Sequence, residues 1–162
     1  MNTLEASLYD LAHLFLVPVL VLILAALAYA FFVLGAFLVE ALQRRLGRYR
    51  SRLQAFHARN GGSSDDLELW ILKRLEWLRV TSRIAPMLGL VATMIPMGPA
   101  LLALTRNDAQ SVGENLVVAF SAVILALIAA SITFLVLIIR RRWLLQELRD
   151  IERGRDAGGV AG

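Results

Sequence analysis

Residues 83–104 read RIAPMLGLVATMIPMGPALLAL, and this stretch decides the class of fold. It carries three prolines and a single threonine, but no charged residue follows Arg83 until the stretch has ended. The charge-free window runs from Ile84 to Thr105, and two more run from Leu11 to Val39 and from Asn115 to Ile139. Each exceeds the roughly 20 residues that an α-helix needs to cross about 30 Å of hydrocarbon. The sequence therefore predicts an all-α polytopic membrane protein with three transmembrane helices.

The composition excludes several kinds of functional site. The chain of 162 residues is 58% hydrophobic and contains no cysteine, so disulfides and thiolate metal sites are excluded. Its two histidines, His13 and His57, are far apart in the sequence. No Ser-His-Asp set, paired carboxylates or glycine-rich phosphate loop occurs, and the charge-free windows offer almost no polar group to a substrate. We therefore expect no metal, no other cofactor and no enzymatic activity.

Basic residues are concentrated in two segments. Ten lie between Glu40 and Arg83 and six from Arg140 onward, whereas the segment between the second and third windows holds Arg106 alone. The positive-inside rule places both basic segments in the cytoplasm, with the N-terminus outside the inner membrane. The basic excess thus reflects topology rather than nucleic-acid binding. The predicted segments are an outer N-terminus (1–10), transmembrane helices (11–39, 84–105 and 114–139), a cytoplasmic helical hairpin (40–83), an outer loop (106–113) and a cytoplasmic tail (140–162).

The segment 40–83 carries two apolar stripes. In its first half apolar residues recur about every 3.5 residues with arginines between them, which is typical of an amphipathic helix. That helix either packs on a partner helix or lies on the membrane surface. Gly61 and Gly62 end it, and the stripe of the next helix predicts packing on the first. The two stripes consist of Leu42, Leu46, Tyr49, Leu53 and Phe56, and of Leu67, Trp70, Ile71, Leu75 and Leu78.

Polar groups inside a hydrocarbon layer are costly unless they are paired, so each one needs an account. The Thr93 hydroxyl either donates a hydrogen bond to the carbonyl four residues earlier or faces a pore. Gly89 lies on the same helix face and permits close approach of a neighbouring helix. In the third helix Ser121 lies only about 20° around the axis from Glu114, so the two form one stripe and are candidate pore-lining residues of an ion pathway. Glu114 lies at the outer end of this helix, where the alternative is a solvated or N-terminal capping carboxylate. No carboxylate lies inside any window, so a proton path built from this chain alone would lack a titratable group.

The segment Ala85 to Thr93, APMLGLVAT, resembles the second-span motif of the TolQ/ExbB/MotA proton-channel family. That motif reads Ala-Pro-Leu-Leu-Gly-Leu, two further residues and then threonine. The resemblance implies a homopentamer in the lipid bilayer whose second and third transmembrane helices line a central pore, with Thr93 as a pore residue. It also implies a single-span partner like ExbD, TolR or MotB, which supplies the membrane aspartate that this chain lacks. Proton flow past that aspartate would pass force to an envelope target.

The three prolines of the second window receive different interpretations. Pro86 lies where the family has its proline, and we expect it in the first turn of a helix, where a missing N–H does little harm. Pro96 and Pro99 have no counterpart in the motif. They would free carbonyls near Ala92 and Ile95 and kink the helix or open it toward a pore.

The third window departs from the family pattern, in which Ala-Leu is followed after two residues by threonine and, after two more, by Gly-Leu. Val123 stands where the threonine is expected and Ala126 where the glycine is expected, and Ser121 would have to supply the hydroxyl instead. Two hypotheses follow. The chain is either a subunit of an ion-driven motor, using H⁺ or Na⁺, or a non-conducting oligomeric membrane scaffold.

Overall fold

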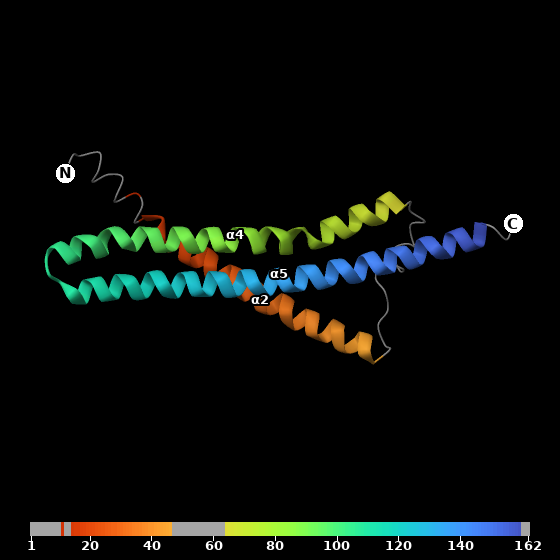
Figure 1. The fold of residues 1–162 in the computed structure, drawn as a ribbon, viewed down its shortest axis with the longest axis horizontal. Helices are drawn as coiled ribbons and strands as arrows, with labels where there is room; N and C mark the ends of the chain where they lie inside the picture. Colours follow the sequence, from red (N-terminus) through yellow and green to blue (C-terminus); the bar gives the residue numbers. More distant parts are fainter. Residues whose placement is uncertain (1–10, 12–13, 47–63, 160–162) are drawn as a thin grey trace. The chain divides into compact units, whose positions relative to one another are not determined.

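Three long helices make up the described part of the chain. The structure, a computed structural model, describes Leu11 and residues 14–46 and 64–159. Helix α2 spans Leu16–Arg45, α4 spans Ser64–Thr105 and α5 spans Ala109–Gly159 (Figure 1). No strand occurs in these residues, and each helix is long and apolar enough to cross a membrane. The predicted all-α class with three membrane-crossing helices is confirmed at this level.

The helices continue well beyond the charge-free windows. Helix α4 begins at Ser64 and passes through Pro86, Pro96 and Pro99 without a break. The prediction that Pro86 lies in the first turn of a helix is therefore wrong, because the apolar stripe before it extends the helix toward the N-terminus. Helix α5 begins at Ala109, inside the segment predicted as an outer loop. Where the membrane starts and ends along these helices stays a prediction.

Part of the predicted cytoplasmic hairpin lies outside the described residues. Residues 47–63 include Gly61, Gly62 and most of the first stripe, and residues 1–10 are the predicted outer N-terminus. The second stripe is described. Four of its members are buried to 3% exposure or less and Trp70 is half-buried, as the periodicity predicts; the four are Leu67, Ile71, Leu75 and Leu78.

The chain divides into two compact units. The first comprises the chain up to Phe32 together with Thr81–Ile132, and the second comprises Val33–Val80 together with the chain from Thr133. The core of the first unit is built mainly from alanines of α4 and α5, packed against larger side chains of α2. Small side chains let helices approach closely where lipid supplies no hydrophobic driving force. Its buried clusters are Val19, Ile23, Ala92, Ala122 and Ala126, and Ala30, Ala85, Ala129 and Ala130.

Gly89 lies where α4 and α5 approach each other closely. A Cβ atom added there would lie 2.9 Å from the Cβ of Ala126 and 3.3 Å from Cγ2 of Val123. Real Cβ atoms essentially never come within 3.0 Å of a heavy atom of another, non-neighbouring residue. The residue at position 89 must therefore lack a side chain for the two helices to keep this distance.

A three-residue turn joins α4 to α5 in the first unit. Asn107 has a positive φ of 52°, which asparagine tolerates better than most residues. The N–H of Asp108 donates to the carbonyl of Ala103 at 3.0 Å, and the N–H of Asn107 donates to that of Leu104 at 3.2 Å. These two bonds form a Schellman motif, which satisfies the last carbonyls of α4.

Asp108 also caps the start of α5. Its Oδ1 accepts a hydrogen bond from the Ser111 N–H at 3.2 Å, and its Oδ2 accepts one from the Ser111 hydroxyl at 2.5 Å. The bond from the Ser111 hydroxyl, followed by the bond from its N–H, lowers the pKa of Asp108 below the ordinary value of 3.8. One aspartate thus ends the turn and begins the next helix.

We expect acid to weaken this cap. A carboxyl group whose pKa is lowered by folding contributes stability above its unfolded pKa, here 3.8, and that contribution is lost as the pH falls through the folded value. The midpoint temperature of thermal unfolding of the purified protein should therefore decrease as the pH is lowered below about 3.8. The decrease should be steeper for the native chain than for Asp108→Asn, which keeps an oxygen acceptor. Glu76 is an exposed carboxylate in the N-terminal half of α4, and its control variant Glu76→Gln should keep the acid slope of the native chain. Equal acid slopes for the native chain and Asp108→Asn would contradict the assignment.

Candidate functional site

Thr93 lies on α4 and is half-buried. Its hydroxyl donates a hydrogen bond of 2.7 Å to the carbonyl of Leu90. The acceptor is therefore three residues earlier, not the Gly89 carbonyl four residues earlier that one of the two interpretations named. Because the hydroxyl uses its hydrogen in this bond, its oxygen keeps lone pairs that can accept a hydrogen bond from another group. The back bond is thus compatible with a role in an ion pathway.

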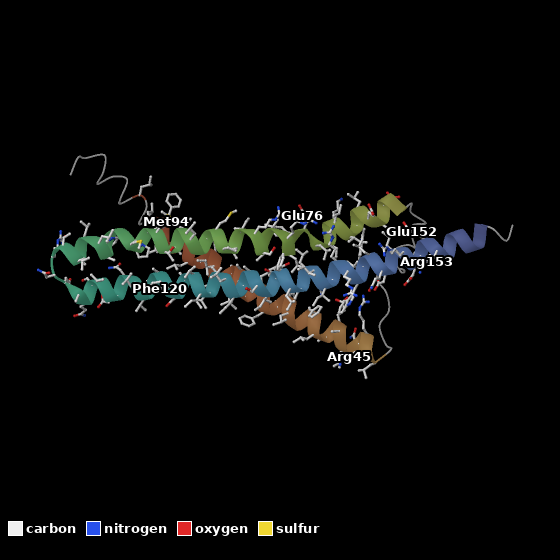
Figure 2. All side chains as sticks on the ribbon, in the orientation of Figure 1. Arg45, Glu76, Met94, Phe120, Glu152 and Arg153 are labelled. Carbon is white, nitrogen blue, oxygen red and sulfur yellow. The ribbon has the colours of Figure 1, made fainter. Side chains whose placement is uncertain are left out.

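Two different faces of α4 meet near Thr93. At about 100° per residue, Thr93 lies at the boundary between a buried face and an exposed one. The exposed face is rich in methionine, and Met94, labelled in Figure 2, is 66% exposed. The buried face consists of Ala85, Gly89, Ala92, Pro96, Ala100 and Ala103, and the exposed face of Met87, Leu90, Met94, Met97 and Leu101. Pro96 thus contributes to the packed side, whereas Pro99 is half-buried.

Ser121 and Glu114 are both exposed on α5. The amide nitrogen Nε2 of Gln110 donates to Oε1 of Glu114 at 3.0 Å. In the part of the chain that the structure describes, no hydrogen bond joins Thr93 to Ser121 or Glu114. All three polar groups reach the surface of the single chain, so any pathway that uses them together has to be completed by other chains.

Val123 contacts α4 rather than projecting away from it. Its Cγ2 atom lies 3.3 Å from the position that a Cβ at Gly89 would take, and the Val123 side chain is half-buried. The position at which the resemblance leads one to expect a threonine is therefore occupied by a packing residue.

A cluster of four charged side chains joins α2 to α5 in the second unit. Oε2 of Glu40 lies 3.0 Å from Nη2 of Arg140, and Oε1 of Glu40 lies 3.6 Å from Nη2 of Arg44. The same Arg44 nitrogen pairs with Oε1 of Glu147 at 2.5 Å. These side chains are only 12–23% exposed. Removing charges from water this far is unfavourable unless they are paired, and here the pairs balance to zero net charge.

Trp143 adds an aromatic contact to the same cluster. Its ring stacks on Phe37, with centroids 5.3 Å apart and planes at 16°. The guanidinium of Arg44 lies over the Trp143 ring, 4.5 Å from its centroid, which is within cation–π range. This cluster was not predicted from the sequence. A signal existed, since Glu40 and Arg140 are the first charged residues after the first and third windows.

No metal site is found in the described residues. Within residues 14–46 and 64–154, no three side chains of His, Cys, Asp or Glu are close enough to share a metal ion. His13 and His57 lie outside those residues.

Comparison with known proteins identifies a family. The model of the MotA/TolQ/ExbB proton channel family matches residues 33–152, which is more than half of the chain. The matched region contains Gly89, Thr93, Val123 and the whole charged cluster. No curated protein and no solved structure matches the chain.

Proposed function

Because the chain belongs to the MotA/TolQ/ExbB proton channel family, we propose that it is the ExbB/TolQ-like subunit of a proton-driven membrane motor. Its oligomer, a pentamer, forms a pore around the transmembrane helices of a single-span partner like ExbD or TolR. The motor converts the proton-motive force into mechanical work on an envelope target. The observation that carries this proposal is the family match over residues 33–152, which includes parts of all three helices.

The distribution of polar groups supports the need for a partner. No Asp, Glu, Lys or Arg occurs in the three charge-free windows, so this chain provides no carboxylate there. The hydroxyl oxygen of Thr93 can accept a hydrogen bond from a hydrated proton or from a protonated carboxyl group of another chain. A carboxylate carried by the partner, next to Thr93, would complete a relay that neither chain holds alone.

The ion pair between Glu40 and Arg140 supports the proposed topology. These residues directly follow the first and the third charge-free windows, and their side chains meet at 3.0 Å. Because one ion pair joins the ends of these two windows, both ends lie at the same depth relative to the membrane. This agrees with placing segments 40–83 and 140–162 together on the cytoplasmic side.

Proton uptake by vesicles tests the proposal. Purifying the chain from the cells that make it should recover a single-span protein with an aspartate in its span. Vesicles that contain both proteins should take up protons down an imposed gradient, whereas vesicles with either protein alone, or with the partner's aspartate changed to asparagine, should not. The measurement is the quenching of a pH-sensitive dye.

The packing role of Val123 favours a second candidate, a non-conducting oligomeric scaffold. In that case position 123 holds α4 and α5 together and contributes nothing to an ion pathway. The same vesicles decide between the two candidates. A co-purified complex that leaves the pH gradient intact would reject the motor and favour the scaffold.

A further inference from the structure

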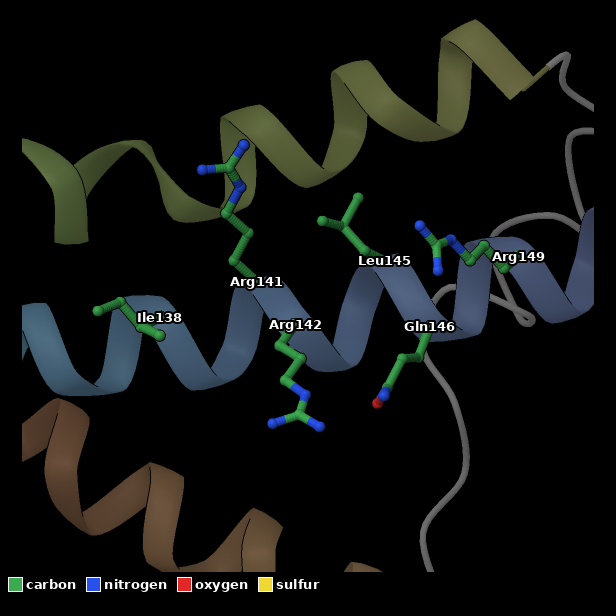
Figure 3. A pocket seen from close by; sticks show the side chains of 6 residues that line it. All are labelled: Ile138, Arg141, Arg142, Leu145, Gln146 and Arg149. Carbon is green, nitrogen blue, oxygen red and sulfur yellow. The ribbon is translucent and has the colours of Figure 1, made fainter.

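A shallow depression lies on one face of α5 in the second unit. It is lined by Ile138, Arg141, Arg142, Leu145, Gln146 and Arg149, and its volume is about 400 Å³. At about 100° per residue, these six positions fall within roughly 140° of the helix circumference. Figure 3 shows Arg141 and Arg142 directed to opposite sides of the depression, and Arg149 extended back along the helix toward Leu145. Leu145 therefore lies between Arg141 and Arg149, and Ile138 lies at the end of the depression nearest the third charge-free window.

These arginines differ from their neighbours in how their charge is balanced. Arg44 and Arg140 pair with Glu40 and Glu147 in the charged cluster. No residue that lines the depression is acidic, and no ion pair joins Arg141, Arg142 or Arg149 to a carboxylate within residues 14–46 and 64–154. The three guanidinium groups thus give the depression a positive charge of three, which a bound anion can balance.

We propose that this depression binds the phosphate headgroup of an anionic phospholipid. Ile138 belongs to the last turn of the third charge-free window, and Arg142 lies only about 6 Å further along the axis at 1.5 Å per residue. That distance is comparable to the headgroup layer, which adds roughly 5–8 Å to each side of the hydrocarbon. The guanidinium of arginine binds phosphate oxygens in a bidentate manner.

The apolar residues identify the source of the phosphate. Ile138 and Leu145, which line the depression together with the arginines, are 50% and 37% exposed. Glycerol carbons and the first methylene groups of a lipid can cover them, whereas a free phosphate ion would leave them in water. The site depends only on the membrane character of the chain, so it goes beyond the proposed motor function and does not require ion conduction.

Lipid titration of the full-length protein in detergent tests the site. Dioctanoyl phosphatidylglycerol should raise the midpoint of thermal unfolding in a saturable manner, whereas dioctanoyl phosphatidylcholine should not. The triple variant Arg141→Gln, Arg142→Gln, Arg149→Gln should lose this response. A single change, Arg142→Gln, should weaken the apparent affinity about fivefold, because one basic residue near an anionic surface contributes about 1 kcal/mol and 1.4 kcal/mol corresponds to tenfold.

The matched control removes three other exposed arginines, Arg45, Arg74 and Arg83, and should keep the response to phosphatidylglycerol. An equal loss in this control would show that overall charge, not the depression, attracts the lipid, and would overturn the proposal. If inorganic phosphate raised the unfolding midpoint of the native protein as much as phosphatidylglycerol does, the proposal that the bound phosphate belongs to a lipid would be overturned. If the triple variant does not fold, an unchanged affinity of Arg142→Gln would overturn the proposal by itself.

Discussion

Replacing Thr93 by valine should lower partner-dependent proton uptake by about tenfold to a hundredfold while leaving the protein folded. Valine has nearly the shape of threonine but lacks the oxygen that accepts a hydrogen bond. A hydrogen bond to a charged group contributes about 1.5–3 kcal/mol, and each 1.36 kcal/mol added to a barrier slows a rate tenfold. The measurement is the initial rate of dye quenching in vesicles that contain both proteins.

Thr105 provides a matched control within the same helix. Its hydroxyl donates to the carbonyl of Leu102 at 2.7 Å, the same distance and spacing as for Thr93 and Leu90. Thr105→Val therefore removes an equivalent back bond at the C-terminal end of α4 and should leave proton uptake unchanged. Thr93→Ser, which keeps a hydroxyl, should retain most of the rate. An unaffected rate in Thr93→Val, or an equal loss in Thr105→Val, would remove Thr93 from the mechanism.

Replacing Gly89 by alanine should destabilise the packing of α4 on α5. The new methyl group would lie 2.9 Å from the Cβ of Ala126, so one helix has to move. Overpacking a helix contact costs about 1–3 kcal/mol, and the better helix propensity of alanine offsets up to about 1 kcal/mol of this. We expect a net loss of about 1–2 kcal/mol in the free energy of unfolding. The measurement is a denaturant titration of the protein in micelles, with unfolding monitored by circular dichroism.

Two comparisons isolate the contact from the general effect of a glycine substitution. A Cβ added at Gly35 meets no atom within 4 Å, so Gly35→Ala should leave stability unchanged or raise it by up to about 1 kcal/mol. The double variant Gly89→Ala, Ala126→Gly moves the methyl group from one helix to the other and should recover most of the loss, which makes the two changes strongly non-additive. Additive losses would show that the 2.9 Å contact is not the cause.

The class of the fold follows from composition because charge in hydrocarbon is so unfavourable. Three windows without charge leave three membrane-crossing helices as the reasonable outcome, and α2, α4 and α5 agree with this. The ends of the helices were harder to predict. Charge marks the surface of a membrane, but a helix does not stop there when an apolar stripe continues it, as the segment from Leu67 to Leu78 does before Pro86.

The contacts between helices could not be predicted because they depend on how far one helix is shifted along another. Periodicity assigns Gly89 to a helix face, but it does not say that Val123 and Ala126 lie opposite. Arg44 and Glu147 are separated by 103 positions, and nothing local relates them. The candidate site residue Thr93 was found by its isolation and its motif, whereas its hydrogen bond to Leu90 came from the structure alone.

The contacts of Trp143 also make it an optical reporter. Its indole lies against the Phe37 ring and the Arg44 guanidinium, both on α2, so its emission depends on neighbours that a different helix supplies. The chain has three tryptophans, and changing Trp70 and Trp77 to phenylalanine leaves Trp143 as the single fluorophore of its kind. Stopped-flow records of that emission would then time any separation of α2 from α5 while the membrane is energised, without an attached dye.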